Sequence, residues 1–225
     1  MEIQDIKVKI CGIRALDDAL VAAEAGADFI GMVFVPERRR RITPKEAKVI
    51  VDGVRNSGGP VPRIVGLFAD QTIEEVAGIV DFCGLDLAQL CGQETVEYAG
   101  RVGCGVIKVV HVAESATVTD DAGTGARVKD FSGVGHLVTL DRYVEGIQGG
   151  TGKGFDWDVA ASLSRSGHPF LLAGGLTPEN ISEAITMVKP WGVDVSSGVE
   201  TDGDKDHRKI RDFMKNARAA AAQTA

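Results

Sequence analysis

Short apolar runs alternate with longer amphipathic segments along the whole chain. Several of the runs, such as 29–35, are apolar on both faces, which is typical of parallel strands that are covered by helices. The pattern therefore predicts eight strands, at 6–11, 28–35, 61–68, 85–91, 104–112, 136–141, 169–173 and 191–196.

The segments between these runs carry signals for helix starts. Threonine stands three residues before glutamate in 43–46 and in 72–75, which is the spacing of a capping box, and Pro44 fits the first helical position. Segment 177–179 begins another helix in a similar way. Segment 113–135 is polar and glycine-rich, and we expect it to be largely loop. Helices are predicted near 15–25, 44–55, 72–82, 93–101, 114–122, 156–166, 178–188 and 206–221.

Eight strand–helix units without a break in composition predict an α/β fold with a single domain over residues 1–225, a closed (β/α)8 barrel (TIM barrel). An open, doubly wound sheet is the alternative. Two charged residues inside predicted strands favour closure, because Lys9 in the first strand and Asp194 in the eighth are each costly to bury alone. The first and eighth strands are neighbours in a closed barrel, so the two side chains can pair there.

The overall charge limits the range of partners. The 225-residue chain has a formal net charge of −7, which argues against a general nucleic-acid binder. No apolar run approaches the roughly 18–20 residues of a membrane span, and the N-terminus lacks a signal-peptide pattern, so we expect a cytoplasmic protein. The four cysteines form no CxxC pair or His/Cys cluster, so we expect free thiols and no metal site.

In barrels of this type, chemistry gathers at the carboxyl ends of the strands. Two segments rich in glycine and serine follow the last two predicted strands, where such barrels often bind phosphate through backbone N–H groups. Either segment alone could be merely a tight turn. A third glycine-rich loop, 149–154, accompanies them and favours a phosphate site. The candidate phosphate-binding residues are Gly174, Gly175, Ser196, Ser197 and Gly198.

Other reactive groups also follow predicted strands. Cys11 ends the first strand and is either an inert core thiol or a reactive group. Asp141 ends the sixth strand, where it is either a cap or ion-pair partner, or a carboxyl that burial keeps protonated so that it can act as an acid. Four arginines occupy 38–41, after the second strand. We expect most of them on the surface and one or two in the mouth, facing an anionic group.

Several motifs occur in a fixed order: KICGI at 9–13, GAD at 26–28, FVP at 34–36, VGLF at 65–68, QL at 89–90, GGTGK at 149–153 through FDW at 155–157, AGGLTPEN at 173–180 and VDVSSGVE at 193–200. Together they cover nearly the whole chain and resemble the phosphoribosylanthranilate isomerase family of tryptophan biosynthesis. The first motif, the 149–157 loop and the last motif are specific, whereas the others alone would not be.

The resemblance implies an Amadori rearrangement of N-(5-phosphoribosyl)anthranilate to its 1-deoxyribulose form, without a metal or organic cofactor. It implies that Cys11 is the general base and Asp141 the general acid, and a thiolate can serve if its neighbours lower its pKa toward neutrality. Arg40 falls where the family's anthranilate-binding arginine lies, with Arg41 as the alternative. The implied partner is a small phosphosugar–anthranilate substrate. We expect a monomer or a homodimer. The candidate lid consists of Gly149, Gly150, Thr151, Gly152 and Lys153.

Two departures from the family pattern leave other functions open. Cys91 stands where the family commonly has histidine, and segment 139–142 is atypical, so the role of Asp141 depends partly on its position ahead of the glycine-rich loop. One alternative is a non-catalytic phosphosugar-binding barrel. Another is a related isomerase of a similar aminoaldose, such as the histidine-pathway intermediate. That relative would be expected to use two aspartates, whereas the first strand here ends in Cys11.

Overall fold

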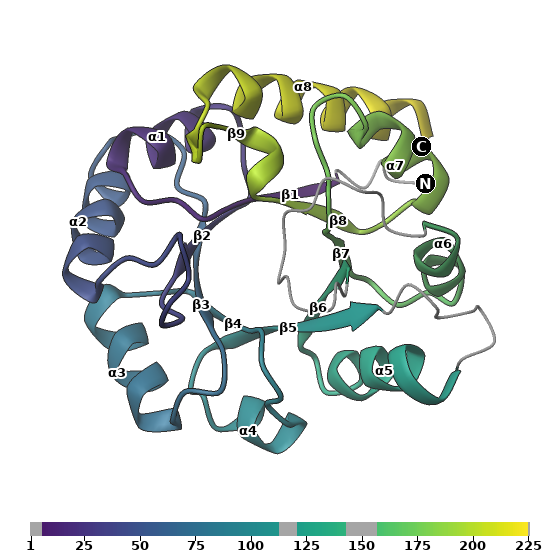
Figure 1. Cartoon of the computed structure of the whole chain (residues 1–225), viewed down its shortest axis with the longest axis horizontal. Helices are drawn as coiled ribbons and strands as arrows, with labels where there is room; N and C mark the ends of the chain where they lie inside the picture. The colour runs from purple at the N-terminus through teal and green to yellow at the C-terminus, as the bar shows by residue number, and fades with distance from the viewer. Residues whose placement is uncertain (1–5, 113–120, 143–156, 225) are drawn as a thin grey trace.

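Eight parallel strands close into a barrel in the computed structural model, and the helices surround it (Figure 1). Each strand pairs with the next one in sequence, and β8 pairs with β1, which confirms the predicted closed barrel and excludes the open sheet. The structure describes residues 6–112, 121–142 and 157–224. The strands are β1 Lys7–Cys11, β2 Phe29–Val33, β3 Arg63–Phe68, β4 Leu87–Leu90, β5 Gly105–Val112, β6 Leu137–Arg142, β7 Leu171–Leu172 and β8 Gly192–Val195.

The helices alternate with these strands and lie outside the barrel (Figure 1). After β8 the chain forms a 3-10 turn, Ser197–Val199, and a short antiparallel pair, β9 Glu200–Thr201 and β10 Asp204–Lys205. The helices are α1 Leu16–Glu24, α2 Pro44–Arg55, α3 Ile73–Cys83, α4 Val96–Gly100, α5 Ala126–Ser132, α6 Trp157–Arg165, α7 Ile181–Val188 and α8 His207–Thr224.

Helix starts follow the local sequence. At α2, the Thr43 hydroxyl accepts from the Glu46 backbone N–H at 3.3 Å and the Glu46 carboxylate accepts from the Thr43 N–H at 2.7 Å, so the predicted capping box forms. The box at α3 forms as well. The prediction for α7 is wrong by three residues, because segment 177–180 makes a turn in which Asn180 bonds the Thr177 N–H and the helix starts at Ile181.

The prediction of a loop over 113–135 is wrong for its second half. Asp121–Gly125 forms a π-helical turn and Ala126–Ser132 forms α5. Val128 and Phe131, three residues apart on this helix, are 0% and 3% exposed, so one apolar turn anchors it to the barrel. The helix predicted near 114–122 falls mostly on 113–120, which lies outside the described residues.

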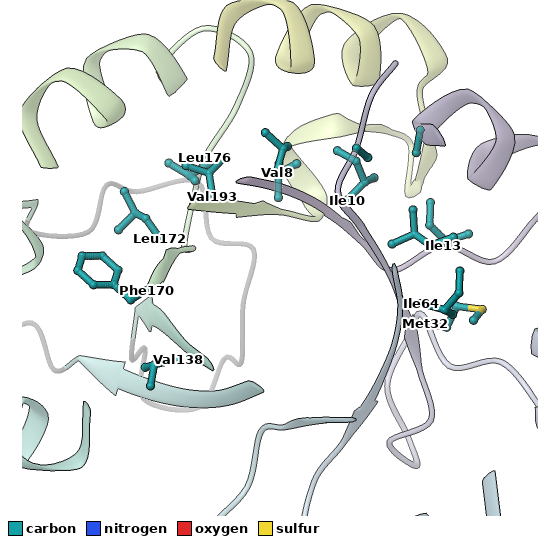
Figure 2. Packing of buried hydrophobic residues seen from close by; sticks show 14 of the residues in the cluster. Val8, Ile10, Ile13, Met32, Ile64, Val138, Phe170, Leu172, Leu176 and Val193 are labelled. Carbon is teal, nitrogen blue, oxygen red and sulfur yellow. The ribbon is translucent and has the colours of Figure 1, made fainter. Parts of the chain in front are cut away.

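Side chains of the strands form two separate apolar layers, because successive residues point to opposite faces. Val8 and Ile10 point outward from β1 to the helices, as Figure 2 shows, and belong to the larger cluster between sheet and helices. Inward-facing residues form a smaller cluster inside the barrel, which includes Cys11, Val65 and Ile107. The barrel interior therefore has a packed core of its own, separate from the layer between the sheet and the helices.

The two charged residues predicted to pair inside the barrel do so. Lys9 and Asp194 are register partners on β1 and β8, and Lys9 Nζ lies 2.7 Å from Asp194 Oδ2. Their side chains are 0% and 7% exposed. An isolated buried charge is strongly unfavourable. Closure of the barrel makes β1 and β8 neighbours, so each of the two buried charges has a partner.

Candidate active site

A cavity of about 490 Å³ opens at the carboxyl ends of the strands. Its lining includes Cys11, Asp141, Arg40 and the segments after β7 and β8. A second hollow, of about 630 Å³, lies at the opposite end of the barrel. There Lys7 and Asp28 pair with each other at 3.0 Å. The candidate catalytic and anion-binding groups therefore lie around the first cavity, which we call the mouth.

Cys11 is the last residue of β1, is 7% exposed and lines the mouth. Its register partner on β2 is Gly31, where a Cβ would lie 3.1 Å from the Cys11 sulfur. Burial raises the pKa of the thiol above its ordinary value; Lys9 and Lys205 oppose this rise, whereas Asp194 adds to it. These residues therefore do not lower the pKa of the thiol toward neutrality, because lost hydration outweighs the two ammonium groups.

Asp141 lies on β6 beside His111 of β5, its register partner, and both residues line the mouth. Burial lowers the pKa of His111, and nearby cations act in the same direction, although a hydrogen bond to the Cys91 backbone opposes them. The imidazole beside Asp141 is therefore neutral near pH 7. Sequence reasoning missed His111, although a polar residue close to the end of an apolar strand was the available signal.

Three of the four successive arginines line the mouth, not the one or two expected: Arg38, Arg39 and Arg40. Arg41 is exposed and does not line it. Arg40 donates from Nε and Nη2 to the two carboxylate oxygens of Glu200, at 2.6 and 2.9 Å. This bidentate pair fixes the guanidinium plane of Arg40 at the rim.

Glu200 is the centre of an ion-pair cluster that sequence reasoning missed. Besides Arg40, it accepts from Arg39 Nη2 at 2.6 Å and from Lys205 Nζ at 2.9 Å. Burial alone would raise the pKa of Glu200, but hydrogen bonds from Arg40 and the charge of Lys205 lower it to about 2. Lys205 also donates to the Ser196 backbone oxygen at 2.8 Å, so the cluster joins the arginine segment to the loop after β8.

The five predicted phosphate-binding residues all line the mouth. Gly174 and Gly175 have φ angles of +91° and +73°, a backbone conformation that favours glycine. A Cβ on Gly198 would lie 1.8 Å from the backbone oxygen of Leu176, so the loops after β7 and β8 are in contact there. The Ser196 hydroxyl donates to the Cys11 backbone oxygen at 3.1 Å, which ties this site to the end of β1.

Cys91, the residue that departs from the family pattern, follows β4 and lines the mouth. Burial raises the pKa of its thiol to about 12, so it remains protonated. Beneath its loop, Lys108 Nζ binds Glu94 Oε2 and the Gly92 backbone oxygen, each at 2.7 Å. The Lys108 and Glu94 side chains are 0% and 2% exposed, which makes this a second buried ion pair.

The predicted lid loop, 149–153, lies outside the described residues. Within 6–112, 121–142 and 157–224, no group of three or more His, Cys, Asp or Glu side chains is placed to hold a metal ion. No helix in that part of the chain is long and apolar enough to span a membrane. All four cysteines are free.

Comparisons with known proteins agree over almost the whole chain. The model of the N-(5'-phosphoribosyl)anthranilate (PRA) isomerase family matches residues 8–216. An N-(5'-phosphoribosyl)anthranilate isomerase from Roseiflexus sp. is 48% identical over 220 residues, covering 96% of this chain and 99% of the relative. The protein of the same name from Dehalococcoides mccartyi is 44% identical over 218 residues, covering 96% and 97%.

Solved structures give the same result. Phosphoribosyl anthranilate isomerase from Thermotoga maritima superimposes with a TM-score of 0.82 at 34% identity, covering 95% of this chain and 99% of that one. A second isomerase structure, in complex with reduced 1-(o-carboxyphenylamino)-1-deoxyribulose 5-phosphate, has a TM-score of 0.78 at 33% identity, with the same coverage. The chain therefore belongs to the N-(5'-phosphoribosyl)anthranilate isomerase family.

Proposed function

We propose that this chain isomerises N-(5'-phosphoribosyl)anthranilate to 1-(2-carboxyphenylamino)-1-deoxyribulose 5-phosphate in tryptophan biosynthesis, with Cys11 as general base and Asp141 as general acid. One observation carries the proposal: a thiol, a carboxyl, an arginine and two glycine-rich loops line the same cavity. They supply a base, an acid and ligands for two anionic groups. The solved relative in complex with a reduced form of such a ribulose phosphate supports this substrate class.

The first step opens the furanose ring. Protonated Asp141 delivers its proton to the ring oxygen, the bond between C1 and that oxygen breaks, and the nitrogen lone pair forms the C1=N bond of a Schiff base. Asp141 is left as a carboxylate and the Schiff-base nitrogen carries the positive charge. His111 is the register partner of Asp141, so a neutral imidazole lies next to the proposed acid during this proton transfer.

The second step removes the proton from C2. The Cys11 thiolate takes it, and the electron pair of the C2–H bond forms the C1=C2 bond of an enolamine, which neutralises the nitrogen. The enolamine then becomes the ketone as its hydroxyl loses a proton and C1 gains one. The cationic Schiff base favours the thiolate beside it, which opposes the effect of burial on the pKa of Cys11.

Two contacts hold the ends of the substrate. Arg40 binds the anthranilate carboxylate with the N–H groups that Glu200 leaves available. Backbone N–H groups of the loops after β7 and β8 bind the phosphate, at residues Gly174, Gly175, Ser196, Ser197 and Gly198. Fixing both ends keeps C1 and C2 between the acid and the base. The loop 149–153 remains our candidate for a lid.

A steady-state assay with freshly generated phosphoribosylanthranilate tests the function, with loss of the anthranilate-type fluorescence as the signal. Cys11→Ala and Asp141→Asn should each lower kcat by about 10²–10⁴-fold with the fold intact. Absence of turnover by the folded wild-type protein would favour the non-catalytic phosphosugar-binding barrel instead. Turnover of the histidine-pathway aminoaldose alone would favour the related isomerase. Full activity in Asp141→Asn would mean that another residue is the acid.

The assembly of the protein stays a prediction. A similar structure from Thermotoga maritima is described as comprising monomers of a dimeric isomerase. We expect this chain to act as a monomer or a homodimer in the cytoplasm, without a metal or organic cofactor. Sedimentation of the purified chain would distinguish the two assemblies.

A further inference from the structure

The mechanism proposed above gives no chemical role to Lys9, a buried cation on the strand that carries the proposed base. Lys9 is 0% exposed and lies two residues before Cys11 on β1, so the two side chains point into the barrel on the same face. A buried ion pair is seldom more stabilising than apolar side chains of the same size. The position of Lys9 next to the proposed base therefore calls for an explanation beyond stability.

We propose that Lys9 is a positioning residue for the base: its ammonium, held by Asp194, lies on the same inner face as the Cys11 sulfur and stabilises the thiolate. This inference rests on the proposed function only in giving the Cys11 thiolate the role of general base. The charge arrangement itself is a property of the folded chain and can be measured without substrate.

The contacts support this role from three sides. Asp194 Oδ2 holds the Lys9 ammonium at 2.7 Å, on the strand that carries Cys11 two residues further on. Gly31 provides the space for both, since a Cβ there would lie 3.1 Å from the Cys11 sulfur and 3.2 Å from Lys9 Cε. Asp194 Oδ1 is buried without a hydrogen-bond partner among the described residues, so the carboxylate directs only its other oxygen to Lys9.

The remaining groups around the sulfur make Lys9 the main cationic influence. The charge of Lys9 lowers the pKa of Cys11 more than the charge of Lys205 does, whereas Asp194 raises it. Burial would lower the pKa of Lys9, but the charges of Asp194 and Cys11 raise it above its usual value, so Lys9 stays protonated when the thiol ionises. Within the described part of the chain, the titratable groups whose charges interact with Cys11 are Lys9 on β1, Asp194 on β8, Lys205 on β10, Arg40 after β2 and Cys91 after β4.

Site-resolved alkylation measures the thiolate directly. Iodoacetamide is added to the full-length protein across a range of pH, and the rate at Cys11 is read by peptide mass spectrometry. An opposite charge a few ångströms away lowers a pKa by about 1–3 units, so Lys9→Met should raise the alkylation midpoint by about that amount. Asp194→Asn should lower the midpoint, because it removes the anion and keeps the cation.

Opposite directions separate this role from a structural one. If Lys9 and Asp194 only hold the barrel together, both variants loosen the mouth and shift the alkylation of Cys11 in the same direction. The double variant Lys9→Met/Asp194→Asn removes the unpaired charge that would hinder folding of the single Lys9 variant. Its midpoint should exceed that of Asp194→Asn, from which it differs only at Lys9.

The second buried lysine offers a matched control. Lys108 is also 0% exposed and paired at 2.7 Å, but it is not among the charges that shift the pKa of Cys11. Lys108→Met should destabilise the fold and leave the Cys11 midpoint unchanged. The proposal is overturned if Lys9 and Lys108 variants shift the midpoint equally, or if the double variant and Asp194→Asn have the same midpoint. If the Cys11 midpoints shift as expected but the protein has no isomerase activity, only the proposed function is refuted.

Discussion

The ion-pair cluster at Glu200 predicts a loss of both stability and substrate affinity when its charge is removed. The Glu200 side chain is 6% exposed and accepts hydrogen bonds from Arg39, Arg40 and Lys205. Glu200→Gln keeps the size of the side chain and one acceptor oxygen. It replaces the other oxygen with an amide NH2 that faces cations, and it leaves Lys205, which is 2% exposed, without its counter-ion.

Two arguments give the same order of magnitude for the loss of stability. The displacement of the Glu200 pKa from 4.5 to about 2 corresponds to about 3 kcal/mol at roughly 1.36 kcal/mol per unit. Removing one partner of a buried ion pair typically costs about 3–5 kcal/mol. For a domain of this size each kcal/mol lowers Tm by about 2–4 °C, so Glu200→Gln should melt about 6–12 °C below the wild type.

The pH dependence of this difference has a defined sign. The pKa of Glu200 is lower in the folded state than in the unfolded chain, so the stabilisation is complete above about pH 5 and is lost as pH falls toward 2. Thermal melts followed by circular dichroism at several pH values should therefore show a constant gap between wild type and variant from about pH 5 to 8. The gap should narrow below about pH 4.5.

The same variant should weaken substrate binding more than catalysis. Arg40 loses the carboxylate that orients its guanidinium, so KM should rise about 10-fold or more while kcat changes less. Glu183→Gln, on the exposed face of α7, is the matched control and should leave Tm and KM unchanged. An unchanged Tm at pH 7 in Glu200→Gln, or a gap that widens toward low pH, would refute the reasoning.

Two further predictions concern the ends of the substrate. Arg40→Ala should raise KM about 10–100-fold in the fluorescence assay while Arg41→Ala leaves it near the wild-type value, and the reverse result would move the carboxylate ligand by one position. Gly198→Ala should lower Tm and weaken inhibition by inorganic phosphate, because its Cβ would overlap the Leu176 backbone oxygen. Gly78→Ala, in α3 with open space around it, should be neutral or stabilising by up to about 1 kcal/mol, and equal effects at both glycines would contradict this account.

The sequence predicted those parts of the site that lie at fixed positions of the strands. Lys9 and Asp194 each stand inside an apolar run, and barrel closure makes their strands neighbours, so their pairing could be anticipated. Lys108 shows the same signal in β5, but its partner Glu94 lies in the segment between β4 and α4. A strand pattern fixes which strands are adjacent and does not fix where a loop side chain points, so this pair could not be anticipated.

The same limit applies to the rim of the mouth. Arg40 and Arg41 differ by one position, and only the backbone between β2 and α2 decides which one faces the cavity; there Arg41 forms an isolated bridge with Val33. Glu200 reaches the arginines from a two-residue strand after β8, 160 residues away in sequence. α5 escaped the pattern because a single apolar turn anchors it, which is too short for a helical period to be visible.

The charges around Cys11 explain why the proposed site uses different ligands for the two anionic groups of its substrate. Among the described residues, the cations Lys9, Lys205 and Arg40 interact with the thiol, whose pKa burial raises. Asp194 pairs with Lys9, and Glu200 pairs with Lys205 and Arg40. A phosphate that recruited one of these lysines would remove the field that supports the thiolate. In the proposed site, backbone N–H groups of the loops after β7 and β8 bind the phosphate without drawing on that charge. In the proposed mechanism Lys9 therefore remains available to the thiolate, Lys205 keeps its contacts with Glu200 and the Ser196 backbone oxygen, and Arg40 is the cation shared with the substrate.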